Sequence, residues 1–210
     1  MPVVGWGHVL AEFVDDVVHN CAVGGATTAS FRAEGHWDRV VAALQSGDTV
    51  VIQFGHNDQK EPDVLAANGG YRRRLTEFVA EVCAAGARPV LATSVERRLF
   101  AADGALVYSH GPYPAAVRAL GHELDVPVID LTVFTRWLYT CLGPDESARL
   151  FAGGVAAAAG ESVEPPLETD NTHYTTTGAR AVAHFVALSL RALDGADDEL
   201  EPLGSWIVQP

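Results

Sequence analysis

An aspartate and a histidine in the last quarter of the chain have the spacing of a catalytic pair. Asp170 and His173 are the first and last residues of the sequence Asp-Asn-Thr-His. On one tight turn, such a carboxylate accepts the Nδ1 proton of the imidazole and leaves Nε2 able to take a proton from a nucleophile. The alternative is a capping turn, in which a threonine starts the helix that follows. The pair is therefore a candidate general base with its orienting acid.

A second polar cluster is the sequence Gly-His-Asn-Asp at residues 55–58, which follows an apolar, β-branched stretch at residues 49–54. That stretch predicts a strand buried on both faces of a parallel sheet and ended by the glycine. Ligands of open α/β sheets bind beyond the carboxyl ends of the strands, so His56, Asn57 and Asp58 are expected at the functional edge. The alternative is a simple turn, because Asn and Asp often bond to their own backbone in turns.

Paired glycines form the third candidate. Gly24 and Gly25 end an apolar run that begins at Val17. The backbone N–H of Gly25 could donate a hydrogen bond to a developing oxyanion, and the side-chain amide of Asn57 could donate a second one. An isolated Gly-Gly also occurs in ordinary turns, and that alternative stays open.

Helical and strand patterns alternate along the chain, which predicts an α/β fold with a doubly wound parallel sheet. The expected helices cover residues 7–14, 36–45, 71–85, 114–124 and 177–193, with one or two more between residues 131 and 152. The expected strands cover residues 17–22, 49–54, 88–93 and 126–130. The helix at 71–85 carries an apolar stripe that we expect to face the core, made of Leu75, Phe78, Val79, Val82 and Cys83.

In this order and spacing, the three clusters resemble the SGNH (GDSL-like) hydrolase superfamily and, within it, the rhamnogalacturonan acetylesterase branch. The resemblance covers nearly the whole chain, with further matching segments at Gly5-Trp6-Gly7, Glu34-Gly35-His36-Trp37, Gly47-Asp48 and Asp130-Leu131. It implies a three-layer, flavodoxin-like sheet. It also implies a serine esterase that deacetylates O-acetylated carbohydrate of the rhamnogalacturonan or pectin type through an acyl-enzyme, without a cofactor.

Carried over residue by residue, the resemblance makes Gly25 and Asn57 oxyanion-hole donors. It makes His173 the general base and Asp170 the residue that orients it. Two other functions stay open on the sequence. One is an SGNH esterase that acts on acetylxylan or short acyl esters, and the other is a carbohydrate-binding pseudoenzyme that does not catalyse.

The sequence departs from the family at the nucleophile. The family's serine lies in a Gly-Asp-Ser segment after the first strand, and no Gly-Asp-Ser occurs in these 210 residues. Thr27 and Ser30 lie nearest the expected oxyanion hole, but neither follows a strand as an exposed nucleophile should. We expect either a chain without its true N-terminus, and therefore without the first central strand, or a pseudoenzyme. In the first case, residues 17–22 should be displaced from residues 49–54 or pair with them directly.

The composition, with 48% hydrophobic residues, fits one N-terminally incomplete domain over residues 1–193, followed by an acidic tail at residues 194–210. The net charge of -13 argues against a nucleic-acid partner, which requires clusters of Lys and Arg. The expected partner is an acetylated oligo- or polysaccharide. A polyanionic polysaccharide would be repelled by the negative chain, so its binding would need local cations. Arg97 and Arg98 are the best candidates, and His56 is a third substrate-binding candidate.

No apolar run is long enough to span a membrane, and no signal-peptide pattern is found, so we expect no membrane partner. The compartment stays unknown, with secretion open if the N-terminus is incomplete. Cys21, Cys83 and Cys141 lie among apolar residues and are expected to be buried without disulfides. No histidine has metal-ligand spacing to a second His or Cys, so no metal site is expected. Residues 153–169 are expected to form a surface loop near the site.

Overall fold

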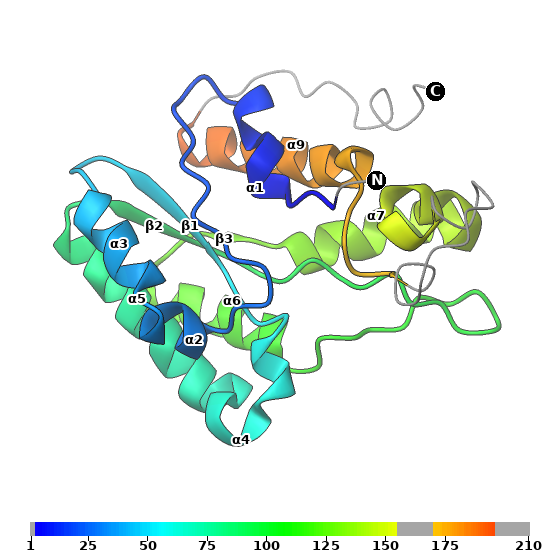
Figure 1. Cartoon of the computed structure of the whole chain (residues 1–210), viewed down its shortest axis with the longest axis horizontal. Coiled ribbons are helices and arrows are strands. Elements are labelled where there is room, and N and C mark those ends of the chain that lie inside the picture. Colours follow the sequence, from blue (N-terminus) through cyan, green and yellow to red (C-terminus); the bar gives the residue numbers. More distant parts are fainter. Residues whose placement is uncertain (1–2, 155–169, 196–210) are drawn as a thin grey trace. The chain divides into compact units, whose positions relative to one another are not determined.

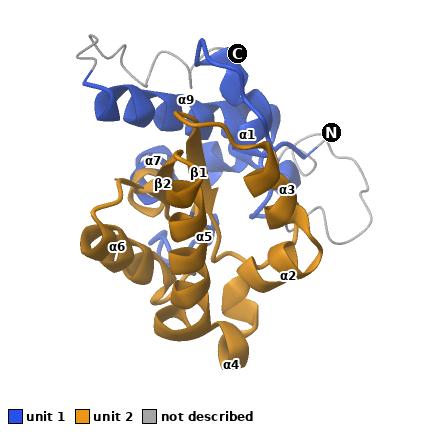
Figure 2. Cartoon of the chain, turned by 90° about the vertical axis from the view of Figure 1, so that its left-hand side faces the viewer, with its two compact units in different colours: residues 1–20, 96–109, 135–210 blue, residues 21–95, 110–134 orange. Residues whose placement is uncertain are grey.

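The chain divides into two compact units, which Figure 2 shows in different colours. Unit 1 comprises residues 1–20, 96–109 and 135–210, and unit 2 comprises residues 21–95 and 110–134. The computed structural model describes residues 3–154 and 170–195. Nearly all of the expected acidic tail and of the expected loop at residues 153–169 therefore lies outside the described residues. The expectation of one domain over residues 1–193 stays a prediction.

Unit 2 contains a parallel sheet of three strands in the order β1-β2-β3 (Figure 1). The strands are β1 (Thr49–Gln53), β2 (Arg88–Ala92) and β3 (Val128–Ile129). Parallel neighbours need crossover connections, which helices α5 (Arg72–Ala84) and α6 (Tyr113–Leu124) supply. These elements confirm the α/β class and the predicted strands at residues 49–54, 88–93 and 126–130.

An apolar core joins the helices of unit 2 to its sheet. Four members of the predicted α5 stripe are buried: Leu75, Phe78, Val79 and Val82. Trp37, from helix α3 (His36–Ala43), stacks on Phe78 with 3.9 Å between ring centroids. Phe31, from helix α2 (Thr28–Ala33), belongs to the same cluster. Each such side chain contributes about 1.5–3 kcal/mol on burial, so this cluster holds α2, α3 and α5 in place.

The prediction that the three cysteines are buried is wrong. Cys21, Cys83 and Cys141 are exposed and form no disulfide. Cys83 follows the buried Val82 in α5 but is itself exposed, because neighbouring helical residues point about 100° apart. Apolar neighbours in the sequence are therefore a poor guide to burial at the edge of a helical stripe.

The predicted strand at residues 17–22 is also wrong. This segment forms no strand, and Val17 is 83% exposed. A β-branched run becomes a strand only where a neighbouring strand and a covering layer accept it. Residues 3–16 form helix α1 (Trp6–Val9) and the 3₁₀ helix η1 (Leu10–Glu12) and add no strand. In the described sheet β1 pairs only with β2. The third layer and the missing central strand stay predictions.

Unit 1 is built around two long helices. Helix α9 (Thr176–Leu193) packs against α1. Helix α7 (Leu131–Ser147), which enters this unit at residue 135, is interrupted at Gly143 (φ 71°) and Pro144. The remaining described elements are η2 (Asp58–Lys60), α4 (Pro62–Leu65) and η3 (Ala67–Tyr71) in unit 2, and η4 (Ala148–Leu150) in unit 1. None of the described helices has both the length and the apolar character needed to cross a membrane.

Candidate active site

The structure brings Asp170 and His173 into direct contact within unit 1. The Nδ1 atom of His173 lies 2.8 Å from Oδ2 of Asp170. The other carboxylate oxygen, Oδ1, accepts hydrogen bonds from the backbone N–H groups of Thr172 (3.0 Å) and His173 (2.9 Å). The Asp170 side chain is 13% exposed and that of His173 is 60% exposed. The acid is therefore enclosed by its own turn, while the imidazole is open to solvent.

The electrostatics of the turn keep Asp170 ionised. Burial alone would raise the pKa of Asp170, but hydrogen bonds from the N–H groups of His173 and Thr172 and from the imidazole outweigh it, and the pKa is lowered. An ionised carboxylate accepts the Nδ1 proton, so we assign the tautomer with the lone pair on Nε2. Among the described residues, His173 Nε2 has no hydrogen-bond partner. The imidazole is thus arranged to accept a proton from a group outside the turn.

The backbone of this turn is fastened to two other segments of unit 1. The N–H groups of Ala152 and Gly153 donate to the carbonyls of His173 (3.0 Å) and Asp170 (3.2 Å). Thr175, which follows the turn, is the N-cap of α9 and accepts a hydrogen bond from the N–H of Gly178 (3.3 Å). The capping alternative is therefore true of Thr175, and it is compatible with the Asp170 and His173 contact.

Arg98 also holds the Asp170–His173 turn in place. Its backbone N–H donates to the carbonyl of Asn171 (2.9 Å), and its Nη1 donates to Oδ1 of Asn171 (2.6 Å). Its Nε donates to Oγ of Ser147 (3.1 Å), and its Nη2 donates to the carbonyl of Pro144, where α7 is interrupted. Burial lowers the pKa of Arg98, and the nearby Asp145 opposes that effect. These contacts favour a positioning role for Arg98, and its substrate-binding role stays a prediction.

Replacing Arg98 with alanine is expected to lower the free energy of unfolding by about 1–3 kcal/mol, because partly buried partners lose charge-assisted hydrogen bonds. Urea denaturation of the purified chain measures this change. The matched control is Arg180→Ala, which removes a half-exposed pair with Glu12 (2.8 Å) and should cost less than about 1 kcal/mol. An equal loss of unfolding free energy in the two variants would contradict the positioning role of Arg98.

The lowered pKa of Asp170 predicts how stability changes with pH. The folded pKa lies below the unfolded value of about 3.9, so this group adds stability at every pH above that value. The contribution disappears as the pH falls through the folded pKa. Urea midpoints between pH 7 and pH 3 should fall more steeply for the unaltered chain than for Asp170→Asn. The control is Asp63→Asn, at an exposed position of α4, and parallel curves for Asp170→Asn would refute the prediction.

The two predicted oxyanion donors lie on neighbouring loops of unit 2. Gly25 has a φ of 80° and is exposed, in a turn closed by a hydrogen bond from the N–H of Ala26 to the carbonyl of Val23 (3.3 Å). The Nδ2 atom of Asn57 donates to the carbonyl of Ala26 (3.2 Å), and Oδ1 of Asn57 accepts from Lys60 Nζ (2.8 Å). Since an amide nitrogen carries two protons, one N–H of Asn57 remains for a ligand.

Asp58 holds these two loops together and is fully buried. Its Oδ1 accepts from both the N–H (2.8 Å) and the hydroxyl (2.6 Å) of Thr28, and its Oδ2 accepts from the N–H of Gly55 (3.0 Å). The sequence placed Asp58 at the functional edge but gave no sign of this bracing role. His56 is half-buried, with its ring 4.8 Å from that of His110. Its substrate-binding role stays a prediction.

Thr27 and Ser30 have a structural role in unit 2. The hydroxyl of Thr27 accepts from the N–H of Ser30 (3.1 Å), and the hydroxyl of Ser30 accepts from the N–H of Thr27 (3.0 Å). This reciprocal pair is a capping box at the start of α2. That neither residue is the nucleophile stays a prediction.

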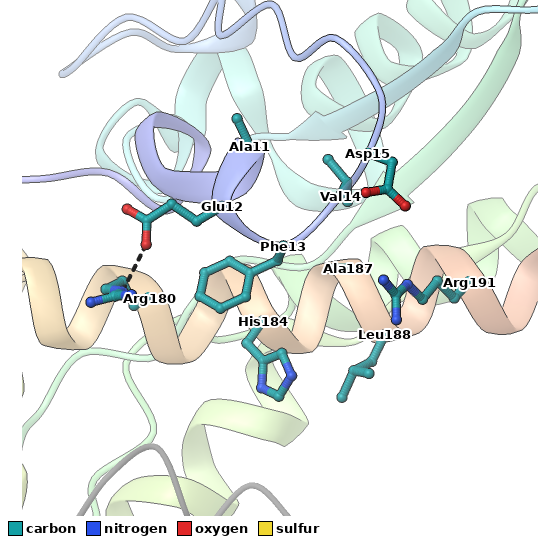
Figure 3. Close-up of a pocket in the computed structure, with 10 residues that line it drawn as sticks. All are labelled: Ala11, Glu12, Phe13, Val14, Asp15, Arg180, His184, Ala187, Leu188 and Arg191. Carbon is teal, nitrogen blue, oxygen red and sulfur yellow. Dashed lines mark ion pairs between the residues drawn. The ribbon is translucent and has the colours of Figure 1, made fainter. Parts of the chain in front are cut away.

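A separate cavity of about 390 Å³ lies in unit 1 between α9 and the segment that follows α1 (Figure 3). The ion pair of Glu12 and Arg180 stands at one end of it, and the rings of Phe13 and His184 face each other with centroids 5.3 Å apart. None of the predicted site residues lines this cavity. In the described part of the chain, no group of three or more His, Cys, Asp or Glu side chains is placed to hold a metal ion.

The parallel sheet with helical crossovers is an α/β fold, and the catalytic roles of Asp170, His173, Gly25 and Asn57 stay predictions. The chain belongs to the GDSL-like Lipase/Acylhydrolase family, which it matches over residues 2–181. The sequence resemblance to this superfamily and to its rhamnogalacturonan acetylesterase branch is thereby confirmed.

Individual relatives within this family also resemble the chain. The chain is 42% identical over 196 residues to rhamnogalacturonan acetylesterase RhgT of Bacillus subtilis, covering 91% of this chain and 82% of RhgT. It is 26% identical over 194 residues to the probable rhamnogalacturonan acetylesterase YesY of the same organism, covering 90% and 84%. The crystal structure of Bacillus subtilis YxiM matches with a TM-score of 0.77 at 25% identity, covering 93% of this chain and 52% of YxiM. The chain thus spans about half the length of YxiM.

Proposed function

We propose that this chain carries the acid, base and oxyanion machinery of a serine esterase that removes acetyl groups from O-acetylated carbohydrate. The observation that carries the proposal is the contact of 2.8 Å between His173 Nδ1 and the Asp170 carboxylate, in a chain of the GDSL-like family. The lowered pKa of Asp170 supports the same role, because the anion stabilises the imidazolium that forms during reaction.

Each residue has a defined part in this reaction. A serine hydroxyl attacks the acetyl carbonyl, and His173 Nε2 takes its proton. The N–H of Gly25 and the amide of Asn57 donate to the oxyanion of the tetrahedral intermediate. His173 then gives its proton to the departing sugar hydroxyl, which leaves an acetyl-serine. Finally His173 takes a proton from water, and the resulting attack releases acetate and restores the serine.

The proposed substrate is an acetylated rhamnogalacturonan or pectin. RhgT is named a rhamnogalacturonan acetylesterase and YesY a probable one, which supports this choice over acetylxylan and short acyl esters. The test is a panel of acetylated rhamnogalacturonan, acetylxylan and nitrophenyl acetate, offered to a version of the chain that carries the Gly-Asp-Ser segment of a relative ahead of Gly5. Acetate release should be fastest from rhamnogalacturonan. Faster release from acetylxylan or nitrophenyl acetate would overturn the proposed specificity.

A second candidate function is carbohydrate binding without catalysis. It is the alternative that the sequence leaves open: these 210 residues contain no Gly-Asp-Ser. Calorimetric titration of the chain with acetylated rhamnogalacturonan oligosaccharide, together with an assay for free acetate, separates the two functions. Tight binding without acetate release, in both the 210-residue chain and the version with the added segment, would favour the binding protein.

A further inference from the structure

An exposed tyrosine of unit 1 contacts an arginine that is itself hydrogen-bonded to a buried carboxylate. The Tyr108 ring is on a residue that is 66% exposed, and the guanidinium of Arg136, from α7, lies 3.7 Å from the ring centroid. One face of the ring therefore contacts a cation. An exposed aromatic side chain that is fixed in this way loses little rotamer entropy when a ligand packs on it.

The arginine is fixed in turn by a buried carboxylate. Arg136 Nε donates to Oε2 of Glu96 (2.9 Å), and the Glu96 side chain is 0% exposed. The other oxygen, Oε1, accepts from the N–H of Ser109 (3.1 Å), the hydroxyl of Ser109 and the N–H of Arg97 (3.1 Å). Burying a carboxylate is costly unless it is paired and hydrogen-bonded. The hydrogen bonds of Glu96 therefore hold Arg136 against the Tyr108 ring.

The same segment is joined to the candidate catalytic turn. Phe100 and Leu106 form an antiparallel bridge, and the N–H of Val107 donates to the carbonyl of Leu99 (2.7 Å). That register places Tyr108 opposite Arg98. Arg98 is the residue whose N–H and Nη1 bind Asn171, next to Asp170. Tyr108 therefore lies beside Arg98, which binds the turn that carries His173.

The local charge suits an acidic ligand. The chain has a net charge of -13, yet three arginines, Arg97, Arg98 and Arg136, lie in this part of unit 1, where the backbone N–H of Arg97 and Nε of Arg136 both donate to Glu96. Within the described residues, the Nη groups of Arg136 have no hydrogen-bond partner. A planar guanidinium binds carboxylates through parallel N–H groups, and an aromatic ring packs against the C–H face of a sugar.

We propose that Tyr108 and Arg136 form a subsite for a uronic-acid residue of the polysaccharide, next to the acetylated residue at His173. The Tyr108 ring packs on the sugar and Arg136 binds the carboxylate. This proposal rests on the proposed function, because it takes the carbohydrate to be the substrate. It assigns recognition of the acidic sugar to Tyr108 and Arg136 rather than to Arg98, which is already engaged with Asn171.

Calorimetric titration of the 210-residue chain tests the subsite without requiring turnover. The probe is an acetylated rhamnogalacturonan oligosaccharide with free galacturonate carboxylates, and the comparison is the same oligosaccharide with methyl-esterified carboxylates. Tyr108→Ala should raise the Kd for the acidic probe by about tenfold, the scale of losing one well-packed aromatic contact. Methyl esterification should raise it to a similar degree in the unaltered chain. The Arg136 contact is thus tested without exposing Glu96.

Two control variants sharpen the test. Tyr108→Phe keeps the ring and should bind like the unaltered chain. Val107→Ala removes an exposed apolar side chain, 43% exposed, from the neighbouring position of the same hairpin and should change the Kd by less than about twofold. If the unaltered chain binds the acidic probe and Tyr108→Ala binds it equally, the subsite is refuted and the proposed function survives. If the unaltered chain binds no acetylated carbohydrate, both are overturned.

Discussion

Esterase turnover on acetylated rhamnogalacturonan is expected to be absent from the 210-residue chain and to appear when a Gly-Asp-Ser segment is added ahead of Gly5. Loss of the nucleophile from a serine hydrolase lowers kcat by about 10⁶-fold. The described serines have other roles. Ser30 caps α2, Ser94 donates to the carbonyl of Phe54 (3.0 Å), and Ser147 donates to the carbonyl of Gly143 (2.6 Å). Addition of the segment should therefore raise acetate release by several orders of magnitude.

Covalent labelling with a fluorophosphonate probe is the sharper measurement, because it reports an activated serine directly. The 210-residue chain should not be labelled, and the version with the added segment should be labelled at the new serine. His173→Ala should abolish that labelling, whereas Ser189→Ala, in α9, should leave it intact, since Ser189 only donates to the carbonyl of Phe185 (2.8 Å). Labelling of a serine in the 210-residue chain, blocked by His173→Ala, would show that another residue serves as the nucleophile.

The features predicted correctly from sequence are those whose signal is local. The apolar run at residues 49–54 and the stripe of α5 have the periods of a strand and an amphipathic helix, and both elements form. The expected burial of the strand on both faces is wrong, because within β1 Ile52 alone is fully buried and the other residues are half-buried or exposed. The contact of Asp170 with His173 is local in the same sense, because one turn contains both residues. The run at residues 17–22 has a strand-like composition too, but it forms no strand. Composition cannot report whether a neighbouring strand is available.

The supports of the candidate site depend on contacts between distant parts of the sequence. Arg98 binds a residue 73 positions away, and Glu96 binds Arg136 across 40 positions. An arginine in a sequence indicates a cation but not whether its five N–H groups will face substrate or protein. The prediction of Arg98 as a substrate ligand rests on its charge and on its place in the loop after a predicted strand. The three-dimensional structure shows that its guanidinium is bonded to Asn171, Ser147 and Pro144.

Asn57 is the second position at which a substitution should have a large effect. In the version of the chain with the added Gly-Asp-Ser segment, Asn57→Ala is expected to lower kcat by about 10²–10³-fold, the usual result of removing one oxyanion-hole donor. The oxyanion exists only after the serine has attacked, so its donor stabilises the transition state more than the bound ester. KM should therefore change little. Steady-state kinetics on acetylated rhamnogalacturonan measures both constants.

The control for Asn57 must separate loss of a donor from movement of the loop. Lys60→Ala removes only the exposed contact to Asn57 Oδ1 (2.8 Å) and should lower kcat by less than about fivefold, since such a contact contributes up to about 1 kcal/mol. The Asn57 amide also holds the carbonyl of Ala26 (3.2 Å), so its loss could displace Gly25. Urea denaturation of Asn57→Ala should show a loss of about 1 kcal/mol, the scale of one hydrogen bond. If kcat of Asn57→Ala stays within fivefold of the parent, like that of Lys60→Ala, Asn57 is not an oxyanion donor, and the N–H of Gly25 must act with a different partner.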